Sequence, residues 1–154
     1  MTFADVHAFA SRLPGVTVGT SWGHRTWMVG KRGFAWERPF TKADIRRFGD
    51  ETPPAGEILG VRVESLEAKD ALLEIAPPGF FTIPHFQGYP ALLIALGKAR
   101  AGDVRAAIED AHAAVTAPRP ARKRVATGVA GTGVAGTHSR RSLKPARSGR
   151  IRLK

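Results

Sequence analysis

Two histidines lie in aromatic-rich segments and are the side chains best suited to acid–base or metal chemistry. His24 follows Trp22 by two positions, and His85 directly precedes Phe86. Imidazole titrates near neutral pH, so these two groups, brought together with Glu37, would form an acid–base pair or a metal site. No ligand spacing such as His-x-x-x-His accompanies them. We therefore expect neither catalytic nor metal-binding residues, and two histidines hydrogen-bonded at a sheet edge.

The same segments define an alternative function, in which the core binds a small molecule or a protein and the C-terminal tail only solubilises the protein or binds RNA. The residues of this candidate pocket are Trp22, His24, His85 and Tyr89. Trp22 and Tyr89 fall in expected loops and are the aromatic side chains expected to be exposed. Trp27 and Trp36 fall on expected strands, which predicts core packing rather than base stacking.

Composition excludes several classes of protein. The chain has 154 residues and no Cys, which rules out disulfides, zinc ribbons, iron–sulfur clusters and a thiol nucleophile. No apolar run is long enough to span a membrane, and the N-terminus lacks signal-peptide features, so we expect a cytoplasmic protein. The glycine-rich residues 128–136 adjoin no strand, helix start or Lys-Ser/Thr ending. No phosphate-binding loop and no cofactor are expected.

The net charge of +11 is confined to one end of the chain. Residues 118–154 contain 11 of the 24 Lys and Arg residues and no acidic residue, whereas residues 1–117 contain 13 cations and all 13 anions. This tail has no aromatic residue and repeats Gly-Val-Ala-Gly-Thr at 128–132 and 133–137. Such a composition predicts a disordered tail with a glycine-rich spacer, because it cannot bury enough apolar surface to offset its ordering entropy.

A smaller basic cluster is expected inside the core. Residues 25–47 carry seven cations against Glu37 and Asp44. A hairpin tip bearing Lys31 and Arg32 beside a short helix bearing Arg46 and Arg47 would form a patch suited to phosphates. A solvated surface that happens to be basic is the alternative.

Hydrophobic periodicity predicts an α+β domain over residues 1–117. The expected helices span residues 3–13, 41–48, 65–75 and 103–116, and the expected strands span residues 26–29, 34–38, 58–64, 80–83 and 91–96. Thr41 and Ser65 are expected helix caps, and Asp44, at the third position of the first turn after Thr41, fits a capping box. Gly30 to Gly33 is a hairpin signal. Hairpins interleaved with helices favour an antiparallel sheet with helices packed on one face.

The core resembles the MmcQ/YjbR family of small bacterial proteins. The matching motifs, in consistent order across residues 5–117, are Leu13-Pro14-Gly15-Val16, Thr20-Ser21-Trp22-Gly23-His24, Phe34-Ala35-Trp36-Glu37-Arg38-Pro39, Ile58-Leu59-Gly60-Val61-Arg62-Val63, Phe80-Phe81-Thr82-Ile83-Pro84-His85-Phe86 and Gly88-Tyr89-Pro90-Ala91. The resemblance implies a CyaY-like α+β fold and, because members are commonly described as DNA-binding, a nucleic-acid partner. Gln87 stands where relatives often have Asp, and the tail extends beyond the usual domain.

Together these features predict a bacterial, non-enzymatic DNA-binding protein that does not read base sequence, with RNA as an alternative partner and no membrane partner. The residues expected to contact nucleic acid are Lys31, Arg32, Lys42, Arg46, Arg47, Arg119, Arg122, Lys123, Arg124, Arg140, Arg141, Lys144, Arg147 and Arg150.

Overall fold

A computed structural model describes residues 1–118 of the chain. Its elements, in chain order, are α1 (Phe3–Ala10), β1 (Val16–Ser21), β2 (His24–Val29), β3 (Arg32–Glu37), α2 (Lys42–Arg47), β4 (Ile58–Arg62), α3 (Leu66–Ile75), β5 (Phe80–Phe81), the 3₁₀ helix η1 (Pro84–Phe86), β6 (Ala91–Ala95) and α4 (Ala101–Thr116). The predicted tail, apart from Pro118, lies outside the described residues, as do the basic side chains expected on it. None of the described helices is both long and apolar enough to cross a bilayer.

The strands form one six-stranded sheet in the order β1-β2-β3-β4-β6-β5, and every neighbouring pair is antiparallel. The predicted α+β class with an antiparallel sheet is therefore confirmed. The predicted hairpin is β2–β3. Its register shifts where Trp27 pairs with Ala35 but Met28 pairs with Gly33, so Phe34 is an extra residue on β3. This bulge turns both Phe34 and Ala35 toward the same side of the sheet, where both are fully buried.

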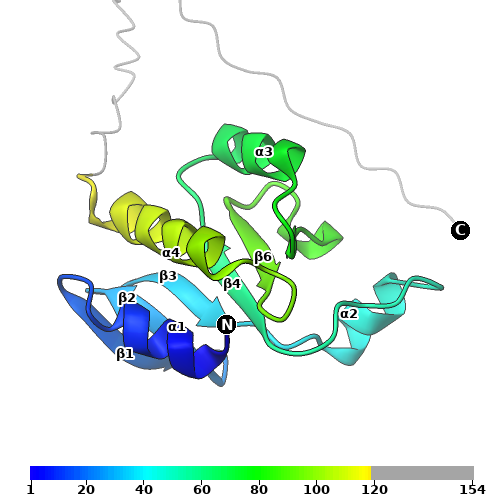
Figure 1. Cartoon of the computed structure of the whole chain (residues 1–154), viewed down its shortest axis with the longest axis horizontal. Helices are drawn as coiled ribbons and strands as arrows, with labels where there is room; N and C mark the ends of the chain where they lie inside the picture. The colour runs from blue at the N-terminus through cyan, green and yellow to red at the C-terminus, as the bar shows by residue number, and fades with distance from the viewer. Residues whose placement is uncertain (119–154) are drawn as a thin grey trace, which may run out of the picture. The chain divides into compact units, whose positions relative to one another are not determined.

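Helices α1 and α4 pack side by side on one face of the sheet (Figure 1). Val6 of α1 and Ile108 of α4 meet Trp27, Leu59 and Ile94 in the main core, and all five side chains are buried. This packing follows from the apolar stripe along each helix and confirms the predicted arrangement for these two helices.

The opposite face of the sheet is covered in its central part by a second apolar cluster. Leu93 of β6 and Phe86 of η1 are buried there, and Trp36 stacks on Phe86 with ring centroids 6.4 Å apart. Because β4 and β6 are covered on both faces, β6 consists of a continuous apolar run, as the sequence predicted.

Strand β1 was not predicted. It pairs with β2 from Val16↔Val29 to Ser21↔His24. Its signal is weak because it is an edge strand with a glycine at position 19, and Val18 is exposed. Its pairing places the chain reversal at Trp22 and Gly23, so the candidate-pocket residue Trp22 lies at the tip of a second hairpin.

Candidate nucleic-acid interface

The short helix α2 is fixed by the capping box that its sequence predicted. The Thr41 hydroxyl accepts a hydrogen bond from the Asp44 backbone N–H, and the Asp44 carboxylate accepts one from the Thr41 backbone N–H, with donor–acceptor distances of 3.2 and 2.9 Å. These reciprocal bonds satisfy two backbone donors that a helix start leaves unpaired. They also orient Asp44 inward and leave the other face of α2 toward solvent.

Asp44 is the buried anchor of this helix. It is 3% exposed, and its Oδ2 lies 2.9 Å from Nη2 of Arg38. Burial alone would raise its pKa, but the hydrogen bonds from Thr41 and the Arg38 guanidinium outweigh burial and lower the pKa below 3.8. Asp44 therefore stays ionised, and Arg38 is committed to holding α2 in place.

The outer face of α2 presents basic side chains. Lys42, Arg46 and Arg47 are all exposed, and Lys42 and Arg46 lie one helical turn apart. Arg47 lies 3.5 Å from Asp44, whereas Lys42 and Arg46 form no ion pair within the described residues. This face, Lys42-Arg46-Arg47, is called the α2 face below. Lys42 and Arg46 are therefore available to an anionic partner.

The other half of the expected core patch has a different role. The Arg32 guanidinium donates to the carbonyls of Val115 and Ala114 at 2.5 and 3.4 Å, so it caps the C-terminal end of α4. Lys31, in the preceding turn, is exposed. The sequence predicted Arg32 as a phosphate contact, but two of its five N–H donors bind backbone carbonyls.

The expectation of one continuous core patch is wrong. Lys31 and Arg32 stand at the start of β3, while α2 follows the end of that strand. Five residue steps of strand separate Arg32 from Glu37, a distance of about 17 Å. Figure 1 shows α2 at one end of the sheet and the C-terminal end of α4 at the other. The core therefore carries two separate basic positions.

The candidate pocket of Trp22, His24, His85 and Tyr89 is also not formed. Tyr89 accepts a hydrogen bond from Arg62 at 3.1 Å, and Arg62 also donates to the carbonyl of Gly33 near the start of β3. His24 lies instead beside the far end of β3, because the neighbouring Arg25 pairs with Glu37 at 3.6 Å. The sheet therefore holds His24 and Tyr89 at opposite ends.

None of these four residues lines the groove beside α3 that is described below, or the hollow between α2 and residues 82–84. His85 is exposed and packs edge-on against Phe86, with ring centroids 5.9 Å apart. Residues 1–118 contain no group of three or more acidic or histidine side chains placed to hold a metal ion. Trp22 and Tyr89 are exposed and Trp27 is buried, as predicted.

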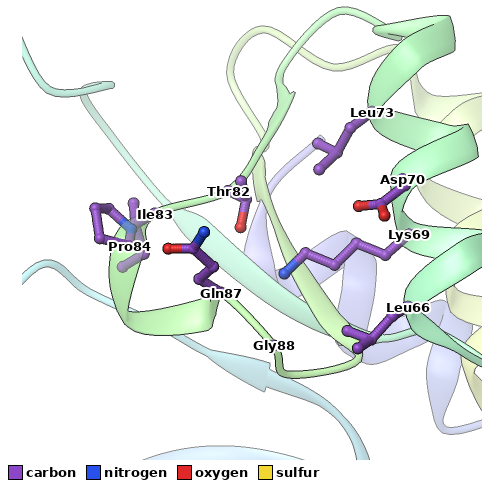
Figure 2. Close-up of a pocket in the computed structure, with 9 residues that line it drawn as sticks. All are labelled: Leu66, Lys69, Asp70, Leu73, Thr82, Ile83, Pro84, Gln87 and Gly88. Atoms are coloured by element: carbon purple, nitrogen blue, oxygen red, sulfur yellow. The ribbon is translucent and has the colours of Figure 1, made fainter.

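A groove that the sequence did not predict lies between α3 and residues 82–88 (Figure 2). Its volume is about 510 Å³, and Leu66, Lys69, Gln87 and Gly88 are among its lining residues. Lys69 is 4% exposed, and its Nζ donates to the carbonyls of Phe86 and Tyr89. The sequence did not predict this burial, because Lys69 occupies an ordinary polar position of an amphipathic helix.

Burial lowers the pKa of Lys69 from its ordinary value of 10.5, and the carboxylate of Asp70 acts in the opposite direction. Lys69 forms no ion pair within the described residues. Two of its three ammonium donors are accounted for by backbone carbonyls. The groove therefore contains a positive charge that is hydrogen-bonded to two backbone carbonyls and lies near the Asp70 carboxylate, which also lines the groove.

Comparison with known proteins identifies relatives of the described domain. "Uncharacterized protein Rv2570" of Mycobacterium tuberculosis and "Uncharacterized protein Mb2600" of Mycobacterium bovis are each 44% identical to the chain over 113 residues. The alignments cover 71% of this chain and 84% of each relative. No family model matches the chain.

A solved structure confirms that the fold occurs elsewhere. The crystal structure of a Pseudomonas syringae protein, structural genomics target PsR293, matches with a TM-score of 0.56 at 14% identity. The match covers 72% of this chain and 96% of that chain. At this identity the likeness concerns the fold alone.

Proposed function

The chain belongs to the family of the mycobacterial proteins Rv2570 and Mb2600, and we propose that it is a non-enzymatic, cytoplasmic DNA-binding protein that contacts mainly phosphates. The observation that carries the proposal is charge segregation. Residues 118–154 hold 11 cations and no anion, whereas the other residues hold 13 of each. Lys and Arg side chains that neutralise phosphates release counterions, which favours binding without base readout.

The α2 face supports the same proposal from within the described domain. Its three cations project from a helix whose only acidic side chain, Asp44, is buried and engaged by Arg38. Because Asp44 is buried and paired, a phosphate that approaches this helix encounters no exposed carboxylate that would repel it. The resemblance to the MmcQ/YjbR family is consistent with this proposal.

The tail and the α2 face are expected to contribute unequally. Each phosphate contact changes the slope of log affinity against log salt by about −0.9, so three α2 cations account for at most about −2.7 and eleven tail cations for about −10. The tail therefore supplies most of the non-specific affinity. The α2 face adds a fixed, geometrically defined contact.

The test is the salt dependence of duplex DNA binding by the full chain, measured by fluorescence anisotropy. One variant replaces all eleven Lys and Arg residues of 118–154 by Gln, and a second carries K42Q, R46Q and R47Q. We expect the tail variant to lose most of the affinity and the slope, and the α2 variant to lose a smaller part of both. Failure of the full chain to bind duplex DNA at moderate salt would overturn the proposal.

If the tail variant binds duplex DNA as tightly as the wild-type chain, the role of the tail is refuted. An RNA duplex of the same sequence tests the alternative partner.

A second candidate function is capture of a small anion by the groove beside α3, because Lys69 places a buried ammonium there. The groove falls in the size range of small-molecule sites. Gln87 and Thr82 offer polar groups on the other side of the groove from Lys69, and the Asp70 carboxylate also lines it (Figure 2). This candidate replaces the unformed pocket around His24 and Tyr89.

Inorganic phosphate is a direct probe of that groove. Saturable NMR shifts of the Gln87 and Gly88 amides are expected in the full chain and in K98M, a control at an exposed lysine outside the groove. K69M should abolish the shifts, and Q87A should weaken them if K69M does not fold. Equal shifts in K69M would exclude a role for the groove.

A further inference from the structure

The turn between β1 and β2 combines backbone strain with an exposed aromatic ring. Ser21 pairs with His24, so Trp22 and Gly23 form a two-residue hairpin loop, and their φ values are +53° and +78°. Positive φ at both positions defines a type I′ turn, whose first position favours Asn, Asp or Gly. A tryptophan is disfavoured in this left-handed conformation, because its Cβ crowds the backbone.

The ring of Trp22 makes almost no contact that would offset this strain. The residue is 97% exposed, whereas Trp27 is buried and Trp36 stacks on Phe86. A large apolar side chain at a strained backbone position destabilises the fold, and here no packing contact offsets that cost. Strain of this kind is characteristic of functional positions, and an aromatic face in solvent is suited to stacking.

Cationic side chains lie toward the same end of the sheet as the turn. Arg25, three residues beyond Trp22, is partly exposed and lies 3.6 Å from Glu37 at the end of β3. The chain then enters α2 at Lys42, five residue steps after Glu37, so the Cα atom of Lys42 lies at most about 18 Å from that of Glu37. The hairpin tip and the α2 face therefore belong to the same end of the sheet.

Proteins that bind single-stranded nucleic acids combine exposed aromatic rings, which stack on bases, with cationic side chains that follow the phosphates. A duplex hides its base faces within the stack, so an exposed indole has no equivalent partner there. We propose that Trp22 stacks on an unpaired base and gives the protein a preference for single-stranded over duplex nucleic acid. This inference rests on the proposed function and names the form of nucleic acid that the core recognises.

The decisive variant is W22N, because Asn suits the turn and the fold should be retained or stabilised. Binding of the full chain is measured to an oligo(dT) strand and to a duplex of equal length at equal salt. Loss of one base stack predicts a fall in single-strand affinity of about 5- to 150-fold, with duplex affinity changed less than about twofold. W22F should retain most of the affinity. V18T, which removes exposed apolar surface from the same hairpin, is the matched control and should behave as wild type.

The outcomes separate the two proposals. If W22N weakens single-strand and duplex binding equally, or weakens neither, Trp22 is not a stacking residue, although DNA binding by the chain stands. If the wild-type chain binds neither nucleic acid, the proposed function itself fails. Quenching of the wild-type tryptophan emission by oligo(dT), lost in W22N, is expected on the same samples. Dependence of anionic-vesicle binding on Trp22, without dependence of oligo(dT) binding, would overturn the inference in favour of a membrane surface.

Discussion

The guanidinium of Arg32 donates a 2.5 Å hydrogen bond to the carbonyl of Val115, joining the start of β3 to the last turn of α4. The two residues are 83 positions apart in the sequence. An arginine that looks like part of a basic surface thus satisfies a carbonyl that α4 cannot pair internally. Arg32 therefore stabilises the fold, and this part of its guanidinium is not available to a ligand.

Replacing Arg32 by Ala should lower the free energy of unfolding by about 1.5 kcal/mol, because a charge-assisted cap of α4 is lost. Chemical denaturation measures this change. K31A, which alters the neighbouring exposed turn residue, is the control and should change stability by less than about 0.5 kcal/mol. Equal stabilities of the two variants would contradict the capping role.

Charge reversal on α2 should weaken DNA binding without unfolding the domain. The double variant K42E/R46E is expected to lower the magnitude of the salt slope by about 2, since two phosphate contacts are lost. R12E/K98E makes the same charge change at exposed positions outside α2 and serves as control. An identical loss of affinity in both variants would show that total charge, rather than the α2 face, determines binding.

Asp44 should make the domain sensitive to acid. Its pKa is lowered in the folded protein, so the stability it contributes is complete above its unfolded pKa, near 3.8, and is lost as the pH falls through the lower folded value. D44N should therefore be less stable than wild type by about 2 kcal/mol at neutral pH, and the two should converge in acid. D50N, at an exposed aspartate, should follow wild type throughout. Urea denaturation across the acid range tests this expectation.

Lys69 should produce a dependence of the same sign at alkaline pH. Burial lowers its folded pKa below 10.5, so the unfolded chain binds more protons between the two values and stability rises with pH in that window. Wild type should therefore gain stability relative to K69M as the pH approaches 10.5. K98M, at an exposed lysine, is the control. The difference in free energy of unfolding between K98M and wild type should not change over this pH range. A flat difference between wild type and K69M would mean that Lys69 is hydrated in the folded state.

Gly60 is required by the packing of Trp36. A Cβ built on Gly60 would lie 2.5 Å from both Nε1 and Cε2 of the Trp36 ring. G60A should destabilise the domain by about 1–3 kcal/mol, because the ring must leave its stack on Phe86. G102A, in the first turn of α4 with no neighbour within 4 Å, should be neutral or stabilising by up to about 1 kcal/mol. Thermal melts of the two variants provide the comparison.

Features that depend on neighbouring residues were predictable from the sequence. The Thr41–Asp44 capping box, the cap at Ser65, the β2–β3 hairpin and the apolar β6 all follow from local spacing, and the structure contains them. The α+β class follows from the same patterns, because their periods decide which elements form. The location of the excess charge in residues 118–154 also needs no structure.

Features that depend on contacts between distant residues were decided by the tertiary structure. Arg32 became a helix cap because α4 ends beside it, and His24 and Tyr89 were separated because the sheet places them at opposite ends. Lys69 is buried because residues 86–89 fold over α3. Local sequence determines most of the elements, but long-range packing determines which polar groups form internal hydrogen bonds and which, like Lys42 and Arg46, stay exposed.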